Sequence, residues 1–224
     1  MIKSRKVQIA YLAMACTVGV IGILASAGLF EAEFRWDFYV YYTNVSNYLC
    51  VAVMIAELVS VLRADENGYI DTLPRLKFMG LVGILLTFIM FNVIMAPTKS
   101  LSYILSIRSI SLHVLIPIIY VLDWFLFYER KKTSWKHPIF ALILPVSYMT
   151  FILIHAAALK FDSSILCFAG DAPLIYPYFF LNYDKLGFGG LVAWAAIILA
   201  ALVTEGYIFY LADRIIPTRK AGKQ

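Results

Sequence analysis

The chain has 224 residues, of which 62% are hydrophobic and only 15% are charged, and its mean hydropathy is +0.81. A soluble domain of this length would carry about 25% charged residues and under about 50% apolar ones, so the surplus apolar surface must face lipid. The net charge of +5 does not indicate a nucleic-acid partner, because the basic residues are spread between apolar segments and form no single patch.

The first apolar segment, 7–30, follows Lys3, Arg5 and Lys6 and therefore resembles a signal peptide. Its apolar run is longer than the roughly 7–15 residues of a signal core. This length favours a first helix that is retained. We expect one transmembrane domain over residues 1–224, with no separate soluble domain.

Six stretches are long enough to cross a bilayer, for which about 20 apolar residues are needed. They are 7–30, 38–62, 77–96, 104–128, 138–159 and 188–212. Each must be helical, because lipid offers no water to the open edge of a strand. Pro97 is expected to end the third helix, and Pro138 to lie in the first turn of the fifth. The predicted fold is all-α, a polytopic bundle of six transmembrane helices.

The basic residues alternate between the two sides of this predicted bundle. One side takes 14 of the 19 Lys and Arg residues, and the other takes five, namely Arg35, Lys99, Arg108, Lys160 and Lys185. Because cytoplasmic loops are enriched in Lys and Arg, both termini are predicted to be cytoplasmic. We expect a multi-pass integral protein of the plasma membrane of a bacterium.

The longest connection, residues 160–187, is rich in aromatic residues and lies on the predicted outer side. Long ordered loops are often functional, and Tyr176 and Tyr178 are candidates for a lid over a site. The alternative is that these rings belong to the belt of aromatic residues at the membrane interface.

Five polar residues are predicted to share one layer of the outer leaflet, although they come from four helices. They are Thr43, Asn47, Asn92, His113 and His155. A polar side chain inside a membrane is costly, so each is a candidate for a functional role. We interpret the layer as a pocket that opens to the outer side or sideways to lipid.

This layer contains the groups needed for acyl transfer. A hydroxyl beside an imidazole can act as a nucleophile with its general base, and Thr43 and His113 supply that pair. The amides of Asn47 or Asn92 could stabilise an oxyanion, and His155 could orient the imidazole. The alternative is structural, because such side chains also hydrogen-bond between packed helices.

Metal binding is a competing reading. His113 and His155, with Asp37 or Asp162, could hold zinc, but the chain has no HExxH motif and no suitable pair of cysteines. We therefore expect no metal and no cofactor.

A second polar set, Glu57, Asp123 and Glu205, is predicted near the inner face. Ion pairing with Lys77, Arg63 or Arg214 would make it a structural anchor. The alternative is a route for protons or cations.

Several short motifs resemble those of known membrane protein families. They are YTNVSN at 42–47, His113 with Pro117 and Asp123-Trp124, YPY at 176–178, Gly187, and TEGY at 204–207. Together they resemble the bacterial Pr6Pr family of six-span membrane proteins. The chain is more distantly similar to the FAR-17a/AIG1-like family, which includes androgen-induced protein and its ADTRP relative.

The resemblance implies a threonine hydrolase of lipid esters, including fatty acid esters of hydroxy fatty acids. By position it implies that Thr43 is the nucleophile and His113 the base, with Tyr42 in the same pocket. The leading hypothesis is therefore an intramembrane hydrolase acting on a lipid-ester substrate. The rivals are a non-catalytic carrier or receptor for lipids or small molecules, and a structural subunit. Catalysis is favoured if Thr43 and His113 lie within about 4 Å of each other beside an open cavity.

Overall fold

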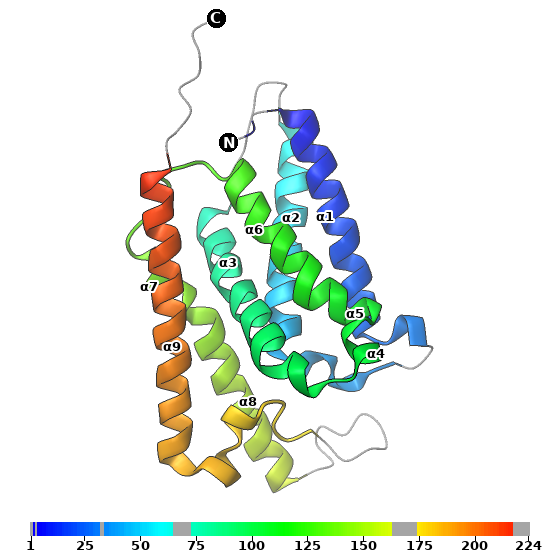
Figure 1. Ribbon diagram of the computed structural model, residues 1–224, viewed down its shortest axis with the longest axis vertical. Coiled ribbons are helices and arrows are strands. Elements are labelled where there is room, and N and C mark those ends of the chain that lie inside the picture. Colours follow the sequence, from blue (N-terminus) through cyan, green and yellow to red (C-terminus); the bar gives the residue numbers. More distant parts are fainter. Residues whose placement is uncertain (1, 3, 32–33, 65–72, 163–173, 217–224) are drawn as a thin grey trace, which may run out of the picture.

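The computed structural model describes residues 2, 4–31, 34–64, 73–162 and 174–216. All the regular elements in these ranges are helical (Figure 1). Six helices are long and apolar enough to cross a membrane: Arg5–Ser26, Tyr42–Arg63, Pro74–Thr98, Ile107–Phe127, His137–Phe161 and Tyr183–Ile215. The predicted all-α bundle of six spanning helices is confirmed.

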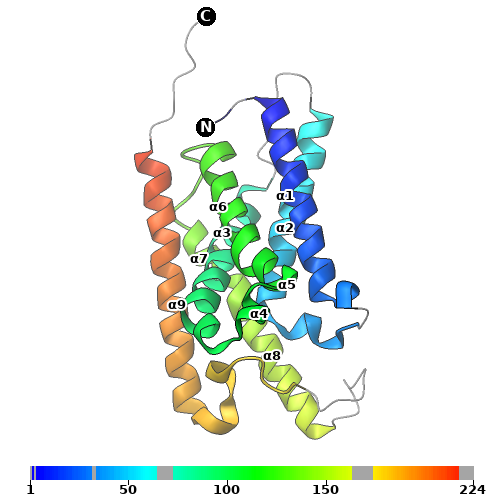
Figure 2. The ribbon, with the colours of Figure 1, turned by 45° about the vertical axis from the view of Figure 1, so that its right-hand side comes forward.

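The N-terminal end of the first spanning helix lies near the C-terminal end of the last one. The beginning of α1 (Arg5–Ser26) and the end of α9 (Tyr183–Ile215) lie at the same end of the bundle, as Figures 1 and 2 show. We call this the terminal end, and the opposite one the distal end. The distal end carries the connections between the first and second, third and fourth, and fifth and sixth spans.

The first, second and sixth spans are each a single helix in the structure, whereas the third, fourth and fifth are divided into segments. The second is α2 (Tyr42–Arg63). The third comprises α3 (Pro74–Ile89), the π-helix η3 (Met90–Met95) and the 3₁₀-helix η4 (Ala96–Thr98). The fourth region comprises α4 (Leu101–Ile104), α5 (Ile107–Ile110), the π-helix η5 (Ser111–Leu115) and α6 (Ile116–Phe127). The fifth is α7 (His137–Ala141) followed by α8 (Ile143–Phe161). The remaining elements are the short 3₁₀-helices η1 (Leu29–Glu31), η2 (Trp36–Val40) and η6 (Phe179–Leu181).

Several helix boundaries differ from the predicted ones for local reasons. The first helix ends at Ser26, because Gly28 adopts φ 83°, a left-handed conformation that terminates a helix. The third passes the predicted stop at Pro97 as a 3₁₀ turn. The sixth begins at Tyr183 and kinks at Gly187, where φ is 64° and ψ is −177°, so the predicted start at Phe188 marks only the part after the kink. Pro138 lies in the first turn of α7, as predicted.

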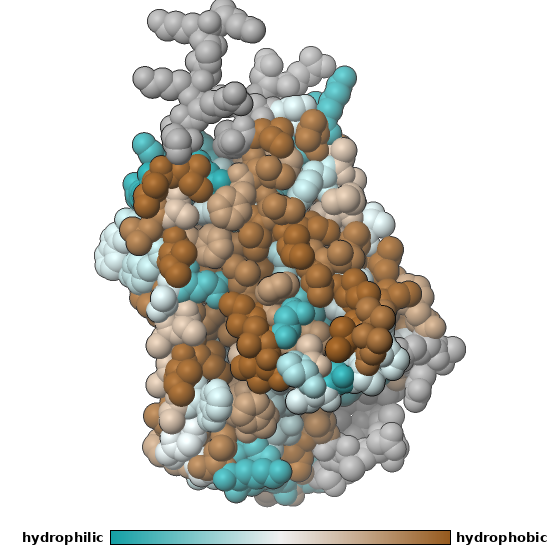
Figure 3. Space-filling model, viewed as in Figure 1, coloured by the Kyte–Doolittle hydropathy of each residue, from teal (hydrophilic) through white to brown (hydrophobic). Residues whose placement is uncertain are grey.

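The apolar core lies among α1, α2, α3 and α6, with the terminal parts of α7 and α9 against it. Large apolar side chains are also exposed on all six spans, and much of the face in Figure 3 is apolar. This pattern is expected of a bundle whose outer surface contacts lipid. Only 11% of the most apolar stretch of α9 is buried, so this helix lies on the outside of the bundle.

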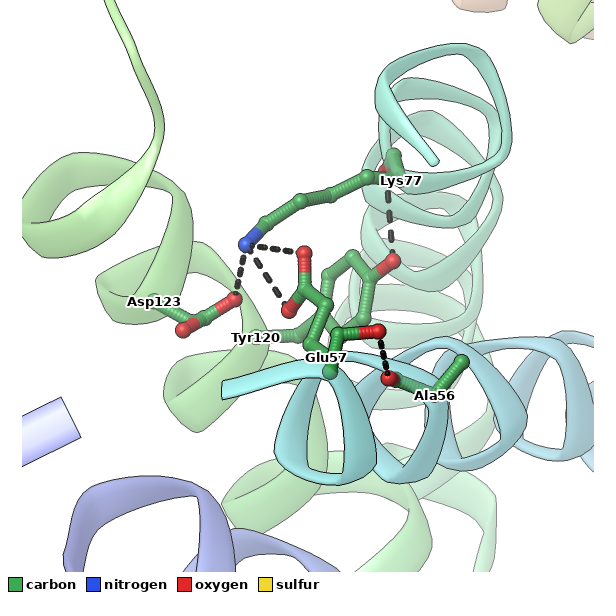
Figure 4. A network of polar contacts seen from close by, with 6 residues as sticks. Ala56, Glu57, Lys77, Tyr120 and Asp123 are labelled. Carbon is green, nitrogen blue, oxygen red and sulfur yellow. Dashed lines mark hydrogen bonds and ion pairs between the residues drawn. The ribbon is translucent and has the colours of Figure 1, made fainter. Parts of the chain in front are cut away.

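A buried cluster of ionic groups joins α2, α3 and α6 (Figure 4). Lys77 Nζ lies 2.8 Å from Glu57 Oε1 and 2.6 Å from Asp123 Oδ2. The exposed fractions of the three residues are 1% or less. Charges this deep are tolerated only when they are paired and hydrogen-bonded, so the cluster supports the structural reading of Glu57 and Asp123. Glu205, on α9, takes no part in these ion pairs.

Candidate functional site

Thr43 and His113 lie side by side near the distal end of the bundle. The Thr43 Oγ1 atom is 3.4 Å from His113 Nε2, and His113 Nδ1 is 3.1 Å from the carbonyl oxygen of Ser109. A carbonyl oxygen can only accept, so the proton of the neutral imidazole is on Nδ1. The lone pair of Nε2 then faces the threonine hydroxyl. This arrangement is the one that a general base and its nucleophile require.

Thr43 owes its position to the start of α2. The carbonyl of Tyr41 accepts the first helical hydrogen bonds, from the N–H groups of Asn44 and Val45. The N–H groups of Tyr42 and Thr43 come earlier and have no carbonyl within the helix to receive them. The nucleophile candidate therefore stands beside two backbone donors at the positive end of the helix dipole.

His113 lies in the π-helix η5, where the usual backbone pairing is disturbed. The N–H of Ile116 donates to Ser111, which leaves the carbonyl of Leu112 without its α-helical donor. Pro117 has no N–H, so the carbonyl of His113 also lacks one. π-helical turns are rare and are frequently found at functional sites.

The two asparagines satisfy these carbonyl groups. Asn47 Nδ2 donates to Leu112 at 3.1 Å and to Thr43 at 2.7 Å. Asn92 Nδ2, in the π-helix η3, donates to His113 at 3.0 Å and to Phe88 at 2.8 Å. We call Asn47 and Asn92 the carboxamide clamp. Both amides already donate to two backbone carbonyls, so the predicted oxyanion role does not match their geometry, because no N–H is left for a substrate.

An aromatic ring restrains the imidazole by stacking on its face. Phe91 stacks on His113 with a centroid distance of 3.6 Å and an interplanar angle of 11°. The exposed fraction of His113 is 6%. The ring can therefore move little, and its Nε2 stays directed at Thr43.

His155 lies apart from this pair. Its Nε2 is 3.2 Å from the hydroxyl of Tyr39, and its ring packs against Tyr39 and Phe151. The predicted layer therefore brings together Thr43, Asn47, Asn92 and His113, whereas His155 contacts a different part of the distal end. The carbonyl of Ser109, and not His155, orients the base.

Metal ligands do not converge in the part of the chain that the structure describes. No group of three His, Cys, Asp or Glu residues there could hold an ion. Asp37 accepts a hydrogen bond from the hydroxyl of Tyr41 at 3.2 Å. Cys16 and Cys50 are buried free thiols on different helices, and Cys167 lies outside the described residues.

An apolar cavity adjoins Thr43. It encloses about 750 Å³ between the protein atoms, its open mouth included, and α2, α3 with η3, α8, α9 and the segment around η6 form its walls. Among the lining residues, only Tyr42, Thr43, Thr87, Tyr148 and Tyr178 carry a side-chain hydroxyl. None of the lining residues is charged. The cavity thus suits a long apolar chain with one weakly polar part near Thr43.

Tyr178 covers the threonine. Its hydroxyl lies beside the Thr43 side chain and the backbone of Tyr42 and Thr43, and both residues line the cavity. Its ring stacks on Phe180 at 5.1 Å. Burial raises the pKa of Tyr178, so the hydroxyl stays protonated at neutral pH. Tyr176 instead lies beneath the Lys160 ammonium group, 5.3 Å from the ring centroid, and does not line this cavity.

Comparison with known proteins gives no match: no family model, no curated protein and no solved structure is significantly similar to this chain. The resemblance to the Pr6Pr and FAR-17a/AIG1-like families therefore stays a prediction.

Some parts of the site were not predicted from the sequence. They are the ring of Phe91, the carbonyl of Ser109 and the backbone donors at the start of α2. Pro117 carries one usable signal, since a proline four residues after His113 leaves that carbonyl without its helical donor. Nothing in the sequence marks the π-helical turn or the stacking of Phe91.

Proposed function

We propose that this chain is an intramembrane hydrolase of lipid esters, with Thr43 as nucleophile and His113 as general base. The observation that carries the proposal is the Thr43–His113 pair, with 3.4 Å between Oγ1 and Nε2, beside an open apolar cavity. The distance between these two side chains is within the limit of about 4 Å that favours catalysis. A lipid would enter sideways, with its apolar chain between α3, α8 and α9.

The acylation step follows from these positions. Thr43 Oγ1 attacks the ester carbonyl carbon while His113 Nε2 takes the hydroxyl proton. The imidazolium is stabilised by its Nδ1–H bond to Ser109. The C–O bond to the leaving alcohol then breaks, and His113 returns the proton to that alcohol. Water, activated by the same imidazole, hydrolyses the acyl-threonine and restores the free hydroxyl.

The oxyanion needs hydrogen-bond donors that do not already donate to another acceptor. The N–H groups of Tyr42 and Thr43 fill this role better than the carboxamide clamp, because they lie at the start of α2, where no helical carbonyl accepts from them. The hydroxyl of Tyr178 lies beside them. In this proposal the ester oxygen displaces that hydroxyl. Backbone donors at a helix start suit a developing negative charge.

The test compares Thr43→Ala, Thr43→Ser and His113→Ala in purified protein. Hydrolysis of a panel of long-chain esters is expected to fall by about 10³-fold in the two alanine variants, as for other nucleophile–base pairs. Thr43→Ser keeps a hydroxyl and should retain labelling by a fluorophosphonate probe. His155→Ala and Thr150→Ala are matched controls outside the pair. Wild-type hydrolysis no faster than that of both alanine variants would contradict the proposal.

The second candidate function is the binding or carriage of a lipid without chemistry. It is favoured by the apolar lining of the cavity, which needs no reaction to attract a chain. One experiment distinguishes lipid carriage from ester hydrolysis. A lipid that co-purifies with the wild type and with Thr43→Ala, and is hydrolysed by neither, supports carriage.

A further inference from the structure

Two cations flank one tyrosine at the distal end. Lys99 Nζ lies 5.5 Å from the centroid of the Tyr103 ring, and the guanidinium of Arg108 lies 5.3 Å from the same centroid. The two charged groups are therefore at most about 11 Å apart. Lys99 is exposed, and Arg108 and Tyr103 are partly exposed. We call these three residues the basic rim.

The basic rim has no acidic residue near it in the sequence. Residues 88–122 contain no Asp or Glu. Within the described ranges, neither Lys99 nor Arg108 lies in an ion pair or donates a side-chain hydrogen bond to a carboxylate, whereas Lys160 at the same end is paired with Asp184. Ring contacts alone partly offset the two charges. Two uncompensated cations in one short connection attract an anion.

The basic rim lies at the level where headgroups meet the apolar interior. Lys99 directly follows the span Pro74–Thr98, and Arg108 is the second residue of the span Ile107–Phe127. A partly exposed tyrosine between them in the sequence is typical of the interface. A phosphate of the surrounding lipid would lie at this depth, and Arg and Lys side chains form charge-assisted hydrogen bonds with phosphate.

From these contacts we infer that the basic rim binds the phosphate of an anionic lipid headgroup. The planar guanidinium of Arg108 can donate two parallel hydrogen bonds to phosphate oxygens, and Lys99 adds a point charge. Both side chains contact the ring of Tyr103, so a phosphate that lies beside this tyrosine would be within reach of both. This inference goes beyond hydrolysis and does not depend on it.

The basic rim also adjoins the candidate active site. Tyr103 packs 6.3 Å from Phe91, which stacks on His113. Arg108 immediately precedes Ser109, whose carbonyl orients the imidazole. A headgroup bound at the rim would therefore lie next to the pair proposed for catalysis.

Lipid binding to the full chain in detergent tests the inference. Affinities for dioleoylphosphatidylglycerol and dioleoylphosphatidylcholine are measured by native mass spectrometry, with inorganic phosphate as a separate arm. The wild type should bind the anionic lipid about tenfold more tightly. Lys99→Gln and Arg108→Gln should each weaken that binding about five- to tenfold, as expected for a lost charge-assisted hydrogen bond. Arg108→Lys should lose less, because it keeps the charge.

Lys185→Gln is the matched control, since it removes one positive charge from the same end of the bundle but lies outside the rim. It should change the affinity less than twofold, and the thermal midpoints of the variants report whether they fold. Equal binding of the two lipids overturns the inference. So does an equal loss in Lys185→Gln and Arg108→Gln. Binding of inorganic phosphate that is as tight and as sensitive to Arg108→Gln assigns the rim to free phosphate and overturns the lipid headgroup.

Discussion

At the scale of the residue, the roles in the candidate site depend on which hydrogen-bonding groups already have partners within the protein. The imidazole of His113 has its Nδ1 bound to Ser109 and its Nε2 directed at Thr43. The amide groups of the carboxamide clamp are committed to backbone carbonyls. The N–H groups of Tyr42 and Thr43 precede the first hydrogen-bonded turn of α2, and the hydroxyl of Tyr178 lies beside them. The chemistry proposed here uses the groups that a substrate can reach.

Tyr178→Phe tests the proposed oxyanion position. The change removes the hydroxyl that covers Thr43 and its neighbouring backbone donors, so an ester oxygen no longer has to displace it. Labelling of Thr43 by a fluorophosphonate probe should therefore become faster. Labelling at an unchanged or lower rate would contradict the role given to this hydroxyl. Tyr176→Phe, outside the cavity, is the control.

Loss of the shared cation from the ionic cluster is expected to lower the stability of the fold. Lys77→Met leaves Glu57 and Asp123 buried without their shared cation. The expected loss is about 3–5 kcal/mol, because an uncompensated buried charge remains. Lys132→Met removes one partner of an exposed pair and should cost under about 1 kcal/mol. Thermal unfolding in detergent compares the two, and similar midpoints would show that the cluster is solvated.

At the scale of the element, the π-helical turn explains why His113 can be held so firmly. An α-helix would bond the carbonyls of Leu112 and His113 within itself, and neither would be open to another helix. The π turn and Pro117 release both carbonyls. Asn47 on α2 and Asn92 on η3 then bind them, so two neighbouring segments fix the backbone that carries the base.

A double-mutant cycle tests this arrangement. Asn92→Ala should cost about 1–3 kcal/mol, because the buried carbonyl of His113 loses its donor. Pro117→Ala supplies an N–H to that carbonyl, so Asn92→Ala should cost at least about 1 kcal/mol less in the Pro117→Ala background. Chemical denaturation measures the four stabilities. Strict additivity would mean that Asn92 does not serve this carbonyl.

At the scale of the whole molecule, α9 borders the cavity between its contacts with α7 and η6. Toward the terminal end it packs on α7, and at the distal end it packs on η6. Gly206 permits the first contact, since a Cβ there would meet Pro138 Cβ at 2.9 Å and its Cα at 3.1 Å. Between the two contacts, α9 lines the cavity with Ala195, Ile198 and Leu199.

Gly206→Val tests this close approach. The added side chain must push α9 away from Pro138, and overpacking of this kind costs about 1–3 kcal/mol. Gly189→Ala is the control on the same helix, because a Cβ there meets nothing within 4 Å. Thermal midpoints in detergent report the difference. Equal midpoints would indicate that α9 is not held at this point.

The sequence by itself determined the six spans, because lipid demands long apolar helices whose backbone groups bond internally. It also placed Thr43 and His113 at one depth, since helical rise converts residue number into distance along the bundle axis. Depth alone does not determine direction around the axis. Helix rotation, the π turn and the packing of neighbouring rings decide that direction. These are tertiary features. They brought Asn47 and Asn92 to the carbonyls of Leu112 and His113, left His155 beside Tyr39, and placed Tyr178 and Thr43 at one cavity.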